Sequence, residues 1–119
     1  MPIELANENG KVIVTDEVVA VLAGSAALDC YGLVGMASRN QFKDGIAELL
    51  GRDNLGRGVE IRNVEGSLEI DVYIIVSYGT KISEVAHNVQ TKLQYVLNDV
   101  IGLRVEQVNV FVQGVRVAR

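Results

Sequence analysis

The residues that could carry chemistry are few and lie far apart in the chain. The one cysteine, Cys30, and the one histidine, His87, are widely separated and make poor material for a Cys–His nucleophilic pair. His87 has no carboxylate or second histidine four residues further on, as a helical metal pair would need. Glu69 and Asp71 share the outward side of a predicted strand and are interpreted as solvated surface. We therefore expect no enzyme, no metal and no cofactor.

A glycine-rich stretch over residues 51–58, GRDNLGRG, is the first candidate for ligand contact. Its backbone N–H groups, together with Arg52, Asn54 and Arg57, could hold an anion or an acidic partner side chain. No Gly-Lys-Ser/Thr follows, so it does not match a phosphate-binding P-loop. The alternative interpretation is a plain connection between a helix and a strand.

A second glycine pair, Gly32 and Gly35, matches the Gly-x-x-Gly pattern of KH RNA-binding modules. In those modules the loop joins two helices and is usually basic. Here it follows a helix, enters an apolar run and contains no Lys or Arg. We interpret it as turn geometry and packing.

The bulk properties favour one globular domain over residues 1–119. No apolar run approaches the roughly 18 residues that a membrane span needs. The first residues show no secretory signal, so we expect the protein to be cytoplasmic. A formal net charge of −4 counts against a general nucleic-acid binder, although a local basic patch remains compatible with it.

The apolar periodicity predicts a long helix over residues 81–102, between two strands over 67–78 and 103–112. Thr80 or Ser83 is expected to cap this helix, and Gly102 to end it. The apolar residues change parity inside the last strand, which indicates a β-bulge near Glu106 and Gln107. If the two flanking strands are parallel, the helix is their crossover connection.

The remaining elements are shorter. Residues 3–6 and 11–14 flank an Asn-Gly turn and form either a hairpin or a single firm strand over 10–14. A small-residue helix follows over 16–30 with Thr15 as its cap, then an extended run over 33–38 and a helix over 41–50. Residues 59–64 pair with 67–78 through Glu65 and Gly66. The fold class is α+β: a two-layer single domain with a small mixed sheet packed against a long C-terminal helix and two shorter helices.

The polar side of the long helix has few charges for a solvated face. It is rich in amides and hydroxyls, a composition typical of an interface. The residues predicted to face a partner are His87, Thr91, Gln94 and Tyr95. Charged substitutions at Gln94 and Tyr95 are expected to weaken association. The alternative is a merely solvated face.

Four landmarks in order resemble the alkaline shock protein family, the Gls24-type envelope stress response proteins of Gram-positive bacteria. They are KVIV from Lys11 before a helix, GLVGM from Gly32, NLGRGV from Asn54 and VNVFVQGV from Val108. The last is the most specific. The resemblance implies a small cytoplasmic protein without known enzymatic activity. Some members reach the membrane through a membrane-anchored partner of the same family, and some self-assemble.

The leading hypothesis is a non-enzymatic protein-interaction module in envelope stress or homeostasis. Its expected partners are proteins, including a membrane-anchored family member or further copies of itself. One alternative is a nucleic-acid or nucleotide binder that uses Arg52 and Arg57, whose binding would fall steeply with salt. Another is an accessory subunit that regulates a metabolic enzyme.

Overall fold

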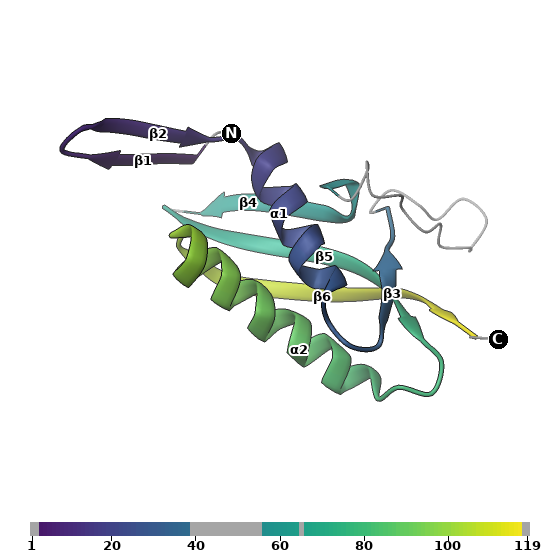
Figure 1. The fold of residues 1–119 in the computed structure, drawn as a ribbon. Coiled ribbons are helices and arrows are strands. Elements are labelled where there is room, and N and C mark those ends of the chain that lie inside the picture. Colours follow the sequence, from purple (N-terminus) through teal and green to yellow (C-terminus); the bar gives the residue numbers. More distant parts are fainter. Residues whose placement is uncertain (1–2, 39–55, 65, 118–119) are drawn as a thin grey trace.

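The computed structural model describes residues 3–38, 56–64 and 66–117, and the predicted helix over 41–50 lies outside them. Both helices and all six strands of this part are labelled in Figure 1 or continue from a labelled element. In chain order they are β1 (Ile3–Asn7), β2 (Gly10–Val14), α1 (Asp16–Leu28), β3 (Leu33–Met36), β4 (Val59–Val64), β5 (Ser67–Ser77), α2 (Ile82–Gln94), its π-helical continuation η2 (Tyr95–Ile101) and β6 (Val105–Arg116).

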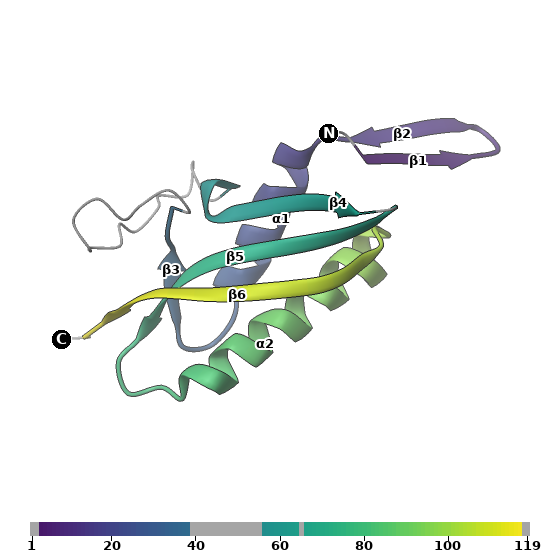
Figure 2. The ribbon, with the colours of Figure 1, turned by 180° about the vertical axis from the view of Figure 1, so that it is seen from behind.

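Strand β5 is the centre of the main sheet. One of its edges pairs in parallel with β6 over nearly its whole length. The other edge is shared by two antiparallel strands, β4 beside the first part of β5 and β3 beside the last part. Figures 1 and 2 show β5 between β4 and β6. The sheet is therefore mixed, as expected from the sequence.

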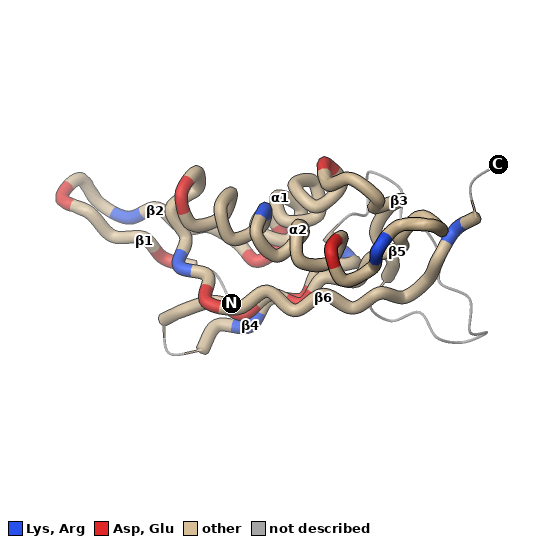
Figure 3. The backbone as a smooth tube through the Cα atoms, turned by 90° about the horizontal axis from the view of Figure 1, so that it is seen from below, with Lys and Arg blue, Asp and Glu red and all other residues tan. Residues whose placement is uncertain are grey.

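Helices α1 and α2 both lie on one face of this sheet, as Figure 3 shows from below. The expected C-terminal position of the long helix is wrong, because α2 lies between β5 and β6 and a strand follows it. The reason is topological: two parallel strands need a long crossover, and the helix supplies it. The two-layer α+β arrangement itself is confirmed.

The side-chain alternation of β5 builds the core. One set of its residues faces the helices and is almost completely buried: Leu68, Ile70, Val72, Ile74 and Val76. Helix α2 contributes Val85, Val89 and Leu93 to the same core, at the spacing of an apolar stripe. Tyr78, which the alternation assigned to the same set, lies beyond the strand and is exposed.

The helix ends agree only partly with the expected caps. The Thr15 hydroxyl accepts a hydrogen bond from the Val18 N–H, which confirms the cap of α1. The expectation for α2 is wrong, because Lys81 precedes its first residue and no side chain caps it. The Thr80 hydroxyl instead donates to the Ser77 carbonyl at 2.7 Å. Gly102, with a positive φ of 91°, ends η2 as expected.

Strand β6 carries two bulges. Leu68 pairs with Val105 and Glu69 with Gln107, so Glu106 is the extra residue and the predicted bulge is confirmed. A second irregularity, which the sequence did not predict, leaves Gln113 as the extra residue between Val112 and Gly114. Each bulge exchanges which residues of β6 face β5 and which face away.

Strands β1 and β2 form a separate antiparallel hairpin that projects from the body (Figure 1). The hairpin alternative is therefore confirmed. Ile3 and Val14 are paired at its root and pack against the core, while Val12 and Ile13 are exposed.

Candidate functional site

A row of side-chain amides on the polar side of α2 and η2 reaches the backbone of β6. Gln90 donates to the Val108 carbonyl at 2.9 Å and Gln94 to the Glu106 carbonyl at 3.3 Å. Asn98 donates to the Val105 carbonyl at 3.2 Å and accepts from the Val105 N–H at 2.7 Å. These residues are four apart and so lie on one side of the helix.

The carbonyls that accept these bonds lie on the outer edge of β6, away from β5. Residues along a strand alternate between the two edges, and the Arg104 carbonyl accepts from Leu68 of β5. The bulge at Glu106 then places the carbonyls of both Val105 and Glu106 on the outer edge. The amide row therefore covers an edge that is otherwise open to strand pairing. This accounts for the low charge of the helix face, since amides can satisfy both donors and acceptors.

The predicted partner-facing residues lie along this same helix side. His87, Thr91 and Tyr95 are exposed, and Gln94 is half-buried with its amide bonded to β6. A groove of about 380 Å³ runs between α2 and β6, lined by His87, Gln90, Thr91, Gln94, Glu106, Gln107, Val108 and Asn109. The structure thus brings three of the four residues together in one groove. Their role toward a partner stays a prediction.

The opposite face of the sheet holds an ionic cluster that the sequence did not reveal. Arg62 of β4 binds both oxygens of Asp71 and donates to Glu69 at 3.2 Å. Asn109 of β6 donates to Asp71 at 2.9 Å. Asp71 is only 5% exposed, so its interpretation as solvated surface is wrong. The signal available in the sequence was an Arg in one predicted hairpin arm and two acids in the other.

The hydrogen bonds from Arg62 hold the pKa of Asp71 below its ordinary value. Burial acts in the opposite direction, and the hydrogen bond from Asn109 reinforces the lowering. The same contacts raise the pKa of Arg62. A carboxylate held ionised by an arginine is a structural ion pair and a poor general acid or base at neutral pH.

The glycine-rich candidate is only partly described. Arg52 and Asn54 lie outside the described residues, and Arg57 is exposed in a short turn before β4. Gly58 beside it has a packing role, since an added Cβ would lie 2.7 Å from the Ala37 carbonyl oxygen. The proposed anion or partner contact of Arg52, Asn54 and Arg57 stays a prediction.

The Gly-x-x-Gly pair leads from the end of α1 into β3. Gly32 has a positive φ of 86°, and its added Cβ would lie 2.8 Å from a Val85 methyl carbon. Its carbonyl accepts from the Ser77 N–H at 2.9 Å, which ties the turn to the end of β5. The geometry favours turn and packing roles for this motif.

Cys30 lies just after α1 and packs partly against the core. Its thiol donates toward the Asn88 carbonyl at 3.9 Å. Burial raises the pKa of this thiol, with a smaller opposing effect of Lys92. Because the thiolate is the reactive form, Cys30 is a weak nucleophile at neutral pH.

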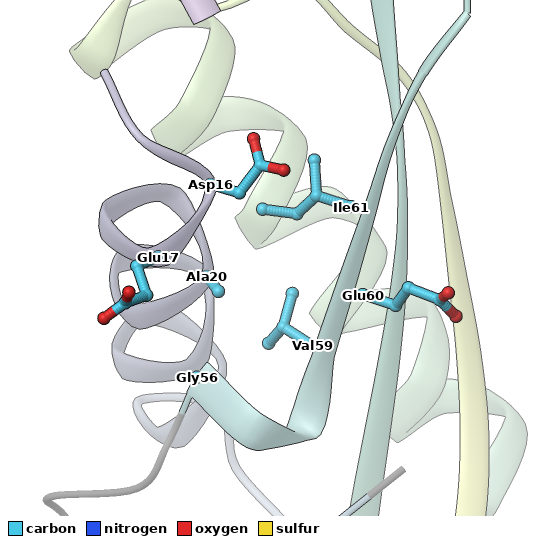
Figure 4. A pocket seen from close by; sticks show the side chains of 7 residues that line it. All are labelled: Asp16, Glu17, Ala20, Gly56, Val59, Glu60 and Ile61. Atoms are coloured by element: carbon cyan, nitrogen blue, oxygen red, sulfur yellow. The ribbon is translucent and has the colours of Figure 1, made fainter. Parts of the chain in front are cut away.

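A groove of about 310 Å³ separates α1 from β4 (Figure 4). Its floor is apolar, built by Ala20, Val59 and Ile61. Figure 4 shows Asp16 beside Ile61, whereas Glu17 and Glu60 point away from the groove. Within the described part of the chain, no three His, Cys, Asp or Glu residues gather in a way that could hold a metal ion. No helix in that part is long and apolar enough to cross a membrane.

The fold and these surfaces define a class of protein: a two-layer α+β domain whose most elaborated surface is a helix side joined to a strand edge. The model of the alkaline shock protein 23 family, described as having a cell envelope-related function, matches residues 4–117. The chain belongs to this family, which confirms the resemblance to alkaline shock proteins.

Similar proteins come from two bacterial species. The uncharacterized protein YloU of Bacillus subtilis is 59% identical over 117 residues, covering 98% of both chains. The uncharacterized protein Spy1614 of Streptococcus pyogenes is 36% identical and covers 98% of this chain and 97% of its own. YqhY of Bacillus subtilis is 34% identical over 107 residues, which are 90% of this chain and 78% of its own.

Among solved structures, the chain is similar to the MamM CTD C267S structure. The sequence identity is 17% and the TM-score 0.49, with 87% of this chain and 96% of that chain covered. Nothing about the function of this protein follows from a likeness at that level.

Proposed function

We propose that this protein is a non-enzymatic interaction module that serves the cell envelope-related role of its family by binding another protein. The partner we propose is a protein held at the membrane, with a membrane-anchored member of the same family as the first candidate. The protein itself would act from the cytoplasm during envelope stress or homeostasis.

One observation carries the proposal: α1 is apolar on both sides. Its inner side is buried against the sheet through Val19, Ala23 and Ala27. Its outer side presents Val18, Val21 and Leu22, which are 36–48% exposed. Helices that are apolar all round are normally buried on all sides, so the outer side of α1 suits a contact with another protein.

The charges on α1 narrow the kind of contact. Its only ionisable residues are Asp16 and Glu17, both in the first turn, where they favour the positive end of the helix dipole. The exposed valines and leucine follow them with no charge interspersed. We therefore expect an aliphatic contact on the partner, with a basic group beside the first turn of α1.

The test compares proteins captured from cells by tagged full-length chains. A Val21→Glu/Leu22→Glu double variant is compared with the unchanged chain, and Val64→Glu serves as a matched control at a half-exposed valine on β4. We expect the unchanged chain and the control to enrich a membrane-anchored protein, and the double variant to lose it.

Purified partner and chain then provide a direct measurement by titration. Circular dichroism confirms that each variant is folded. Equal enrichment by all three chains contradicts the placement on α1. Capture of no membrane-anchored protein by the unchanged chain contradicts the proposed function.

A further inference from the structure

The outer edge of β6 is covered over only part of its length. The amide row satisfies carbonyls as far as Val108. The next positions in that row, moving toward the start of α2, are Ala86 and Ile82, which carry no hydrogen-bonding side chain. Among the described strands, β5 alone pairs with β6. The outer edge therefore stays open beyond residue 109.

The open part of the edge has a regular polarity. Since Glu106 and Val108 present carbonyls outward, Val110 and Val112 follow them on the outer edge. The Arg116 carbonyl accepts from the Tyr78 N–H and faces inward. The bulge at Gln113 thus makes Val115 and Val117 the outward residues of the last part.

All four outward residues are valines, and their positions are symmetric about the point between Gln113 and Gly114. Their side chains share the face that the helices cover, since Val112 pairs with Ile74 and Val115 with Val76. Three of them are exposed, at 36% for Val112, 48% for Val115 and 65% for Val117. Such exposure is high for aliphatic side chains on a strand edge.

A symmetric edge is what an isologous contact between two identical chains requires. We propose that a second copy of this chain adds its β6 antiparallel to this edge, about a two-fold axis between Gln113 and Gly114. Val112 then lies opposite Val115 of the other copy, and Val110 opposite Val117. Each of these pairs is hydrogen-bonded through backbone groups that point outward in both chains, so the hydrogen-bonding polarity agrees with the side-chain pairing.

The same register is favourable on the other face of the sheet. Phe111, which stacks on Tyr73 with ring centroids 4.9 Å apart, lies opposite Arg116 of the other copy. Phe111 is half-exposed and Arg116 is exposed, so an arginine can lie over the free side of the ring. Both strands carry the bulge, so the numbers of residues between the valine pairs match. The two sheets become one continuous sheet.

This inference is independent of the proposed contact on α1. The two are separable, because a chain that cannot pair through β6 still presents α1. A monomeric variant that captures the membrane-anchored partner leaves the proposed function intact. A chain that dimerises and captures nothing leaves the dimer intact.

Sedimentation equilibrium of the full chain tests the association. We expect a concentration-dependent dimer for the unchanged chain and for Val64→Lys, and a shift to monomer mass for Val115→Lys. Mixing Val115→Lys with Val112→Glu is expected to restore a heterodimer, because opposite charges then face each other. A monomer for the unchanged chain, or an undiminished dimer for Val115→Lys, overturns the proposal.

Cysteine cross-linking tests the register in a Cys30→Ala background. Antiparallel hydrogen-bonded pairs place Cα atoms about 5.5 Å apart, within the range of a disulfide. An equimolar mixture of Val112→Cys and Val115→Cys chains is expected to cross-link under mild oxidation, while each chain alone does so far less. Equal cross-linking in all three samples, or none in the mixture, overturns the proposed register.

Discussion

The side-chain amide of Gln90 donates a 2.9 Å hydrogen bond to the backbone carbonyl of Val108. This bond is the last of the amide row and marks where the covered part of the β6 edge ends. One row of residues on α2 thus divides the edge into a part that is satisfied within the chain and a part that is open.

Asn98 is expected to be the most important member of the row for stability. It bonds both the N–H and the carbonyl of Val105, at a half-buried position. Replacing Asn98 with Ala leaves both groups unpaired and should lower the free energy of unfolding by about 1–3 kcal/mol. Urea unfolding measures this loss. Asp99→Ala at the exposed neighbouring position is the control and should change little.

Tyr95 and Gln94 separate association from stability. Tyr95→Lys changes an exposed residue, so it should leave urea unfolding nearly unchanged. Gln94→Lys removes the hydrogen bond to the Glu106 carbonyl and should cost about 1 kcal/mol of stability. If this helix side contacts a partner, both variants weaken association measured by sedimentation or pull-down. Unchanged association in Tyr95→Lys would remove the partner role from this side of α2.

The Arg62–Asp71 pair makes stability depend on pH. Asp71 has its pKa lowered in the folded protein, so its contribution is fully present above the unfolded value of about 3.9. That contribution is lost as the pH falls through the lower folded value. Asp71→Asn should therefore flatten the decrease in unfolding free energy that the unchanged chain shows below about pH 4. Urea unfolding at a series of acidic pH values measures both profiles, and parallel profiles would contradict this role of Asp71.

Removing the other partner of this pair leaves a nearly buried carboxylate without its arginine. Arg62→Met should destabilise the protein by about 1–2 kcal/mol at neutral pH, a value reduced because the arginine side chain is partly exposed. The exposed pair of Lys11 and Glu4 is the control. Glu4→Gln should change the unfolding free energy by less than about 0.5 kcal/mol. Equal effects of the two variants would contradict a structural role for the buried pair.

Gly32 and Gly66 provide a matched comparison of backbone strain and close packing. Both have a positive φ, 86° and 87°, but only Gly32 has a neighbour where a Cβ would be placed, at 2.8 Å from a Val85 methyl carbon. Gly66→Ala should cost about 1–2 kcal/mol from backbone strain alone. Gly32→Ala should cost about 1–3 kcal/mol more through the clash. Thermal unfolding of both variants measures the difference, and equal midpoints would contradict the packing role.

Features that depend on local periodicity were predictable. The apolar stripe of α2, the alternation in β5 and the β4–β5 hairpin each follow from spacing within one stretch of chain. The bulge at Glu106 was readable because the valine parity changes on either side of it. The second bulge at Gln113 was not, because Val115 lies near the end of the strand, where few residues reveal a parity.

Contacts between distant stretches were decided only by the tertiary structure. The amides of α2 look like a free polar face in the sequence, because a helix pattern does not say which strand edge lies beside it. The cluster of Arg62, Asp71 and Asn109 draws one residue from each of three strands. The position of the long helix between two parallel strands likewise depends on strand pairing.

The sequence by itself determined the elements, the core-facing side of each and the family to which the chain belongs, because these follow from local spacing and motif order. Only the tertiary structure decided that the polar side of α2 covers the edge of β6 as far as Val108 and leaves the rest open. The physical reason is that a backbone carbonyl carries no sequence signature. Which carbonyls need a partner is known only when the strands have been paired and the bulges placed.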